Sequence, residues 1–149
     1  MTKKAPFLLS KRLSTLESAT SAKRYIGKRV YSTSGDYVGR VVDLSLYEDA
    51  YVGLIVRGRQ LLYIDKEYCE PENVDTIILK IDPITLLKGK IVFDSAGKRL
   101  GRVTGFERSG VRNACDTILV KKNIFKKPVS VPYSAVETSK KNIILNQEY

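Results

Sequence analysis

Apolar and polar residues alternate in short stretches along this chain, and turn-forming residues separate the stretches. Residues 25–31 alternate and run into a turn centred on Gly35. Residues 37–47 then alternate again, with Val42 and Leu46 among those on one face. An alternation with a period of two is typical of a β-strand with one buried face. Further strands are expected at residues 50–57, 60–65 and 76–81, with a helical turn or loop at 66–73.

The first part of this pattern occurs twice. Seven residues recur with the same displacement of 62 positions: Gly27, Lys28, Val30, Gly35, Gly39, Arg40 and Val41 match Gly89, Lys90, Val92, Gly97, Gly101, Arg102 and Val103. An internal repeat indicates a chain built from copies of one structural unit. We therefore predict an all-β protein with two small antiparallel barrels in tandem, at residues 25–83 and 84–149, behind a tail at residues 1–24.

The second copy is expected to follow the strand plan of the first, with strands at residues 90–93, 99–106, 117–120, 128–132 and 142–145. In each copy the third glycine, Gly39 or Gly101, lies inside a predicted strand. A glycine at such a place usually marks a bulge, a sharp bend or a close approach of two backbones. These glycines are therefore interpreted as structural.

The tail, residues 1–24, is rich in Ser, Thr, Lys and Arg, and Glu17 is its only acid. Leu9, Leu13 and Leu16 fall at the spacing of one face of a short amphipathic helix, although so short a helix is marginal in isolation. Two interpretations stay open. The tail is either a basic arm that becomes ordered on an anionic partner or a disordered segment.

Net charge points to the kind of partner. The 149 residues carry a formal charge of +10 and contain no histidine, which favours an anionic partner. The charge is unevenly distributed. The tail has six Lys and Arg against one acid, the first copy has seven against ten, and the second copy has thirteen against five. The second copy and the tail are thus expected to carry the contact, with the acidic first copy facing solvent or a basic protein.

In the second copy, positive charge gathers at a predicted hairpin loop around residues 123–125. Four lysines flank this loop, and an anion between them would relieve their repulsion. We expect that anion to be RNA phosphate, with Phe125 or Tyr133 available for stacking on a base; the alternative is a solvated hairpin tip. The residues expected to bind nucleic acid are Lys3, Lys4, Lys11, Arg12, Lys23, Arg24, Arg99, Arg102, Arg108, Arg112, Lys121, Lys122, Phe125, Lys126 and Lys127.

The sequence lacks the patterns of catalytic and metal sites. Cys69 and Cys115 lie far apart and at non-equivalent places in the two copies, so neither a metal-binding pair nor a repeated disulfide is predicted. Carboxylate pairs such as Glu48 and Asp49 fall in predicted turns, where solvated surface is expected. We expect two reduced thiols, no cofactor and no enzymatic activity. No apolar run approaches the roughly 20 residues that span a bilayer, which favours a cytoplasmic protein.

The motif Gly-Lys-x-Val-Tyr/Phe-x-x-x-Gly-x-x-x-Gly-Arg-Val, at residues 27–41 and again at 89–103, resembles the opening of the PRC-barrel domain. An apolar-Pro-Tyr segment, typical of the family before its last strand, is matched at residues 131–133 but not in the first copy. The resemblance implies a non-enzymatic binding module. Members of this family serve RNA-processing machinery, photosynthetic complexes and archaeal cell-division assemblies. The tandem form looks most like the small stand-alone archaeal members.

Three functions are compatible with these features of the sequence. The first is an RNA- or ribosome-associated protein whose second copy and tail hold the phosphate backbone. The alternative is a protein–protein adaptor, for example in archaeal cell division, that assembles through an acidic first copy and a basic second copy and is able to self-associate. The third is attachment to a membrane surface through the leucines and lysines of the tail.

Overall fold

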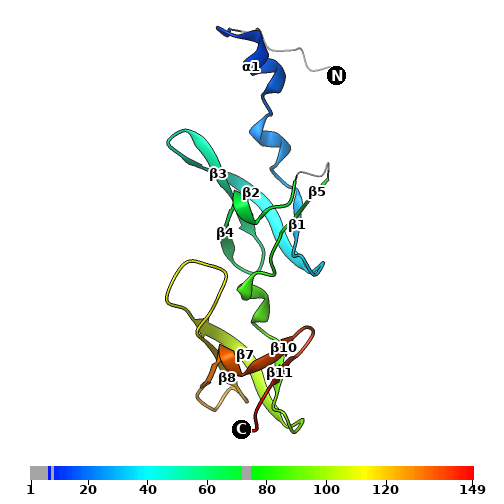
Figure 1. Ribbon diagram of the computed structural model, residues 1–149, viewed down its shortest axis with the longest axis vertical. Helices are drawn as coiled ribbons and strands as arrows, with labels where there is room; N and C mark the ends of the chain where they lie inside the picture. Colours follow the sequence, from blue (N-terminus) through cyan, green and yellow to red (C-terminus); the bar gives the residue numbers. More distant parts are fainter. Residues whose placement is uncertain (1–6, 8, 72–74) are drawn as a thin grey trace.

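The computed structural model describes residues 7, 9–71 and 75–149. Its described part is all-β, with two sheets stacked along the long axis of the molecule (Figure 1). The first sheet has the order β4-β3-β2-β1-β5 and is made of β1 (Arg29–Tyr31), β2 (Tyr37–Tyr47), β3 (Ala50–Arg57), β4 (Leu61–Asp65) and β5 (Thr76–Ile78). The second has the order β10-β11-β6-β7-β8-β9 and is made of β6 (Ile91–Phe93), β7 (Arg99–Glu107), β8 (Thr117–Lys121), β9 (Val129–Pro132), β10 (Val136–Ser139) and β11 (Ile143–Leu145).

Helical structure among the described residues is limited to short pieces. A six-residue α-helix, α1 (Leu13–Ser18), lies in the tail. Four 3-10 turns complete the chain: η1 (Ala22–Arg24), η2 (Lys66–Tyr68), η3 (Ile84–Leu87) and η4 (Tyr133–Ala135). The turns η2 and η4 occupy the same place in the two units, between the fourth strand and the return to the sheet. Asp65 caps η2 by accepting a hydrogen bond from the Glu67 amide at 2.9 Å, whereas Pro132 precedes η4.

Each sheet contains one parallel pair, so the prediction of purely antiparallel units was wrong in this respect. β1 pairs in parallel with β5, and β6 pairs in parallel with β11. A parallel pair needs a long connection between its strands. Three strands and η2 supply it in the first unit, and four strands and η4 supply it in the second. Alternation along a sequence shows which face of a strand is buried, but it does not show the direction of the neighbouring strand.

Strand pairing among the described residues does not close either sheet into a barrel. β4 and β5 remain the outer strands of the first sheet, and β9 and β10 those of the second. In the second sheet the turn η4 nevertheless joins the outer strands β9 and β10 directly, and in the first sheet η2 follows the outer strand β4. After η2, an isolated bridge between Cys69 and Leu79 brings the chain back beside β5.

The cores of the two units are built from equivalent residues, as the repeat predicts. Equivalence follows from the displacement of 62 along the first two strands and from the ladder register beyond them. The first core therefore pairs Val30, Val41, Leu54, Val56, Ile64, Ile77 and Leu79 with Val92, Val103, Ile118, Val120, Val131, Ile143 and Leu145 of the second, and all fourteen are buried. Each sheet thus surrounds its own hydrophobic cluster.

A β-bulge changes the predicted inward face of β2. The ladder between β2 and β3 shifts between Val41 and Asp43, and the extra residue moves the alternation by one position. Val41 is buried at 1% exposure, whereas Val42 is 39% exposed and Leu46, near the hairpin tip, is 63% exposed. The expectation that Val42 and Leu46 face the core was therefore wrong.

Gly39 and Gly101 mark places where two backbones meet. A Cβ atom on Gly39 would lie 2.4 Å from the carbonyl oxygen of Arg57, and one on Gly101 would lie 2.3 Å from that of Lys121. No side chain fits at such distances. The predicted close approach at these glycines is confirmed, and it recurs at the same point of each sheet.

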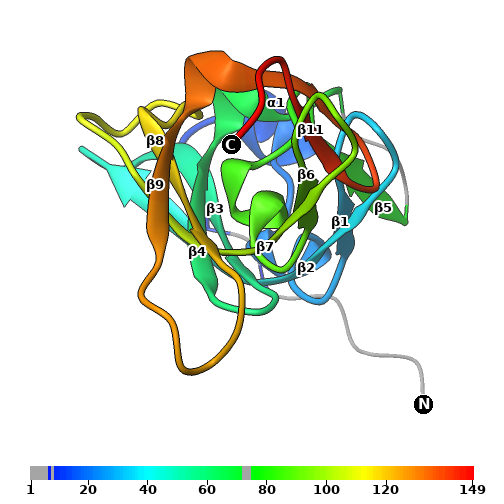
Figure 2. The same cartoon turned by 90° about the horizontal axis from the view of Figure 1, so that it is seen from below.

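The turn η3 forms the joint between the sheets. Leu86 packs against the first core, while Ile84 and Leu87 belong to the second. Viewed along the long axis, the strands of both sheets surround a common centre, where the green turn η3 lies (Figure 2). The turn η1 stands at the equivalent place before the first sheet, since residues 22–24 precede residues 84–86 by the same 62 positions. The repeated unit thus begins before residue 25.

Candidate functional site

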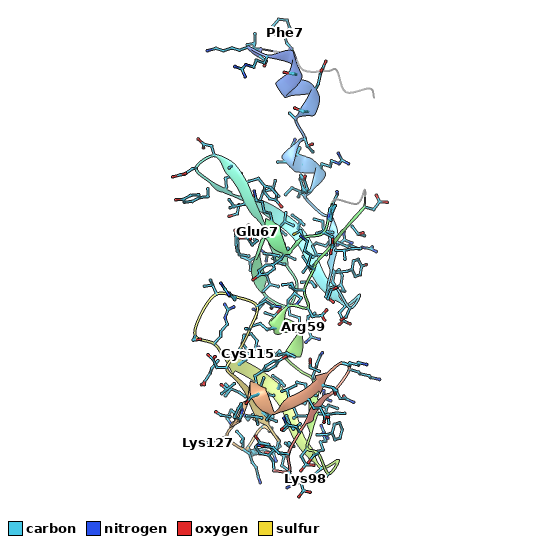
Figure 3. The ribbon with its side chains drawn as sticks, viewed as in Figure 1. Phe7, Arg59, Glu67, Lys98, Cys115 and Lys127 are labelled. Atoms are coloured by element: carbon cyan, nitrogen blue, oxygen red, sulfur yellow. The ribbon has the colours of Figure 1, made fainter. Side chains whose placement is uncertain are left out.

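A pocket with a positively charged rim lies at the end of the second sheet that faces away from the first. Its cations come from two loops: Lys98 and Arg99 follow the β6–β7 turn, and Lys122, Lys126 and Lys127 belong to the β8–β9 loop. We call this hollow, of about 320 Å³, the cationic pocket. Lys98 and Lys127 mark the lower end of the molecule in Figure 3. Five cations around one hollow make an anionic ligand the favourable occupant.

The floor of the cationic pocket is apolar. Leu100, Val120, Val129 and Val131 line it. Val120 and Val131 are buried in the second core, whereas Val129 is 57% exposed. A floor of this kind offers burial to an apolar group, in addition to the charge of the rim.

A buried carboxylate fixes the β6–β7 side of the rim. Asp94 Oδ1 accepts hydrogen bonds from the Ala96 amide at 3.0 Å and the Lys98 amide at 2.9 Å, and Oδ2 accepts one from the Tyr149 amide at 3.3 Å. Burial opposes ionisation of Asp94, but these hydrogen bonds outweigh it, so the pKa lies below the ordinary value. The turn that carries Lys98 is therefore held by three backbone contacts.

The β8–β9 side of the rim is a loop with its own internal contacts. Asn123 accepts a hydrogen bond from the Phe125 amide through its side chain at 3.0 Å, and one from the Lys126 amide through its carbonyl at 3.3 Å. Across the pocket, Lys98 Nζ donates to the Tyr149 carbonyl oxygen at 2.9 Å. Tyr149 also lines the hollow.

Only part of the predicted nucleic-acid-binding set meets at this pocket. Arg99, Lys122, Lys126 and Lys127 line it together. Lys98 lines it too, although the predicted set omits this residue; its position beside Arg99, directly after the turn glycine, was the signal that could have identified it. Phe125 is 90% exposed at the loop tip and is not among the lining residues.

Lys121 and Arg102 do not line the cationic pocket. They lie opposite each other in the ladder between β7 and β8. Arg102 Nη1 donates to the Gly89 carbonyl oxygen at 3.0 Å, and its equivalent Arg40 donates to that of Gly27 at 3.1 Å. Because both copies make this contact, we assign Arg102 a structural role. The four hairpin lysines therefore do not act as one group.

The remaining predicted residues lie elsewhere. Arg108 and Arg112 belong to the β7–β8 loop at the other end of β8, beside the joint. In the tail, Lys11 and Arg12 adjoin α1 and Lys23 and Arg24 lie on η1, at the end of the molecule opposite the second sheet (Figure 1). Lys3 and Lys4 lie outside the described residues. Tyr133, named for stacking, is half-buried against the second core.

A second, larger hollow of about 1640 Å³ lies at the joint between the sheets. Its lining mixes both signs of charge: three acids, Asp36, Asp82 and Glu137, occur with six cations, Arg59, Lys88, Lys90, Arg102, Lys140 and Lys141. Arg59, near the middle of the molecule in Figure 3, crosses it by donating from Nη1 to the Lys88 carbonyl oxygen at 2.9 Å. The hollow at the joint thus lacks the exclusively positive rim of the cationic pocket.

The two thiols are poorly suited to chemistry. Burial, with a smaller effect of Asp65, raises the pKa of Cys69 to about 11, and burial also raises that of Cys115. Both cysteines are free and stay protonated at neutral pH. In the described part of the chain, no three His, Cys, Asp or Glu residues come together as metal ligands. The same part contains no helix of sufficient length and apolar character to cross a membrane.

Comparison of the chain with known proteins does not identify a family. No family model matches the chain, and no curated protein sequence matches it.

Proposed function

We propose that this chain is a non-enzymatic adaptor that docks an acidic polypeptide in the cationic pocket. The observation that carries the proposal is the apolar floor beneath five cations. A phosphate backbone requires cations alone, whereas a polypeptide supplies carboxylates for the rim and an apolar side chain for the floor. The uneven charge of the two copies supports the same function, because the copy that carries the pocket has thirteen Lys and Arg against five acids, whereas the first copy is acidic.

A second candidate is binding of RNA through the tip of the β8–β9 loop, as the charge pattern of the sequence predicts. The observation in its favour is the exposure of two apolar side chains between lysines: Phe125 is 90% and Ile124 81% exposed. An exposed aromatic ring beside cations is the usual means of stacking on an unpaired base. This surface lies outside the pocket, so the two candidates are separable by substitution.

The resemblance to the PRC-barrel family supports the proposed class of function. In this proposal the two curved sheets are tandem PRC-type barrels whose outer strands are joined by η2 and η4 rather than by a further ladder. Small archaeal members of the family are the expected counterparts. Free thiols at Cys69 and Cys115 fit a reducing cytoplasm.

Fluorescence anisotropy of the full chain with labelled oligo-glutamate, and with oligouridine of equal length, tests the adaptor proposal. We expect oligo-glutamate to bind with an affinity that falls as salt rises. The triple substitution Lys122→Glu, Lys126→Glu, Lys127→Glu should weaken it more than about tenfold, since each cation lost removes on the order of 1 kcal/mol or less. The matched control, Arg108→Glu with Arg112→Glu, reverses exposed charges outside the pocket and should have much less effect.

The two candidates differ in their response to Phe125→Ala. This substitution should leave oligo-glutamate binding unchanged, because Phe125 does not line the pocket. The adaptor proposal is overturned in favour of RNA by three observations together: oligouridine binds, Phe125→Ala weakens that binding, and oligo-glutamate shows no salt-dependent binding.

A further inference from the structure

The cationic pocket is the counterpart of a surface that is already occupied in the first unit. Val38 and Leu100 are equivalent through the displacement of 62. Leu62 and Val129 are equivalent through the ladders, since Leu62 pairs with Val56 and Val129 with Val120. The β3–β4 turn of the first unit corresponds to the β8–β9 loop of the second. Leu100, Val129 and the loop beside the cationic pocket thus have counterparts at the lower end of the first sheet, where the joint lies.

In the first unit the turn η3 covers part of this surface, and Val38, Leu62 and Leu86 also border the larger hollow of the joint. Leu86 packs against the first core, in which Leu62 is half-buried and Val38 buried. Arg59, on the β3–β4 turn, holds the chain after η3 through the carbonyl oxygen of Lys88. In the second unit Val129, the equivalent of Leu62, stays 57% exposed. The fold therefore shows, within one molecule, both an occupied and an open form of the same apolar site.

Charge distinguishes the open site from the occupied one. Asp36 of the first unit is replaced by Lys98, and Tyr37 by Arg99. The short turn around Arg59 is replaced by a longer loop with three lysines on the pocket rim. The open site has kept the apolar floor and gained cations. A segment that fits it therefore needs an apolar anchor between acidic residues.

A second copy of this chain does not meet that requirement. The segment of a second copy equivalent to η3 is η1, and Lys23 and Arg24 stand where η3 has Thr85 and Leu86. Seating η1 in the pocket would bring two further cations to a rim that already has five, and it would place Arg24 on the apolar floor. Repulsion between like charges thus opposes head-to-tail binding of a second copy of the same chain.

We infer that the cationic pocket receives a leucine-sized side chain, presented on a short turn and flanked by acidic residues, from a different protein. The inference rests on the adaptor proposal and adds the anchor and its mode of binding. The apolar anchor takes the place that Leu86 has in the first unit. Its acidic neighbours pair with the lysines and Arg99 of the rim.

A pair of synthetic peptides tests the anchor on the full chain. The first contains the joint sequence Asp-Pro-Ile-Thr-Leu-Leu of residues 82–87 between short runs of glutamate. The second has alanine in place of the leucine that corresponds to Leu86. We expect the leucine peptide to bind about tenfold more tightly, because the alanine peptide lacks the three side-chain carbons that the floor would bury.

Substitution of the floor supplies the matching test on the protein. Val129→Thr is nearly isosteric and should reduce the advantage of the leucine peptide several-fold while leaving the alanine peptide unaffected. Val111→Thr, at a valine that is 91% exposed in the β7–β8 loop, is the control and should change neither. In methyl NMR spectra the leucine peptide should shift Val129 and Leu100 but not Val111.

Each alternative outcome is distinct. Equal binding of both peptides, lost on reversal of the rim lysines, overturns the anchor but leaves the adaptor proposal standing. No binding of either peptide or of oligo-glutamate refutes both. Concentration-dependent association of the chain alone, abolished by Val129→Thr in sedimentation velocity, identifies a second copy as the occupant instead. Oligouridine that shifts the Val129 methyls as the leucine peptide does identifies RNA.

Discussion

Asp94 and Ser32 occupy equivalent places in the two copies of one turn and stabilise it in different ways. Ser32 Oγ accepts a hydrogen bond from the Asp36 amide at 3.1 Å. Asp94 accepts from three amides, including that of Tyr149. Both side chains are buried, at 1% and 3% exposure. The carboxylate thus ties the turn of the second unit to Tyr149, whereas the Ser32 hydroxyl makes its further contact with the Asp82 carboxylate.

The lowered pKa of Asp94 predicts a pH-dependent stability of the second sheet. A carboxyl whose pKa is depressed by folding stabilises the fold above its unfolded pKa, near the ordinary value of about 3.9, and this contribution is lost as pH falls through the folded pKa. We expect Asp94→Ser to lower the free energy of unfolding at pH 7 and to have a much smaller effect near pH 2. Urea unfolding at both pH values measures the difference.

The serine of the first unit makes this a controlled comparison. Asp94→Ser keeps one acceptor for the Lys98 amide, as Ser32 does for Asp36, so the turn itself should persist. An equal effect of Asp94→Ser at pH 7 and pH 2 would contradict the role of the ionised carboxylate.

At the scale of the elements, the sequence predicted most strands because the same pattern occurs twice. Residues 76–79 and 142–145 share an isoleucine pair followed by a leucine, and they contain the strands β5 and β11. The direction of pairing could not be predicted, because alternation carries no information about a neighbour. The bulge after Val41 was missed for a related reason: an inserted residue shifts burial without interrupting the run of apolar residues.

The candidate site was predicted in part, and the missing part has a simple cause. The strand β8 ends at Lys121, which lies opposite Arg102 in the ladder, whereas Lys122 belongs to the β8–β9 loop, so the two lysines differ in position although they adjoin in sequence. Arg108, Arg112 and the tail were grouped with the hairpin by charge alone. Their distance from it depends on how the chain folds. The apolar floor was not recognisable from sequence, because Val129 and Leu100 read as ordinary core positions.

The turn η3 is the element whose side chains join the two cores, and Leu86 is its contact with the first. We expect replacement of Leu86 with arginine, the residue at the equivalent position of η1, to destabilise the first sheet by about 1–3 kcal/mol. This is less than the loss of a fully buried leucine costs, because Leu86 is only half-buried. Hydrogen exchange at the amides of Val38 and Leu54 measures this loss. Val111→Arg adds the same charge at an exposed valine and should leave these amides protected. An unchanged exchange rate in Leu86→Arg would show that η3 does not stabilise the first sheet.

At the scale of the whole molecule, a chain of hydrogen bonds holds the sheets in one arrangement. Asn113, on the β7–β8 loop of the second unit, accepts from the Ile84 amide and donates to the Asp82 carbonyl oxygen, both at 2.8 Å. Asp82 in turn accepts from the amide and hydroxyl of Ser34 in the first unit, at 3.0 and 2.6 Å. Desolvation opposes ionisation of Asp82, but the bonds from Ser34 outweigh it and lower its pKa. The joint thus connects a loop of one sheet to a turn of the other.

Asn113→Ala should therefore loosen the two sheets relative to each other without unfolding either. The substitution removes both contacts of Asn113 but no core residue, so backbone 15N relaxation should report faster and less uniform tumbling of the two units while their amide shifts stay near those of the parent chain. Asn123→Ala, in the β8–β9 loop away from the joint, is the control and should tumble as the parent does. Acidification should act in the same direction, because the Ser34 contact is present while Asp82 is ionised and weakens as pH falls through its lowered pKa. If Asn113→Ala still tumbles as one body at neutral pH, the core contacts of η3 are sufficient to fix the joint.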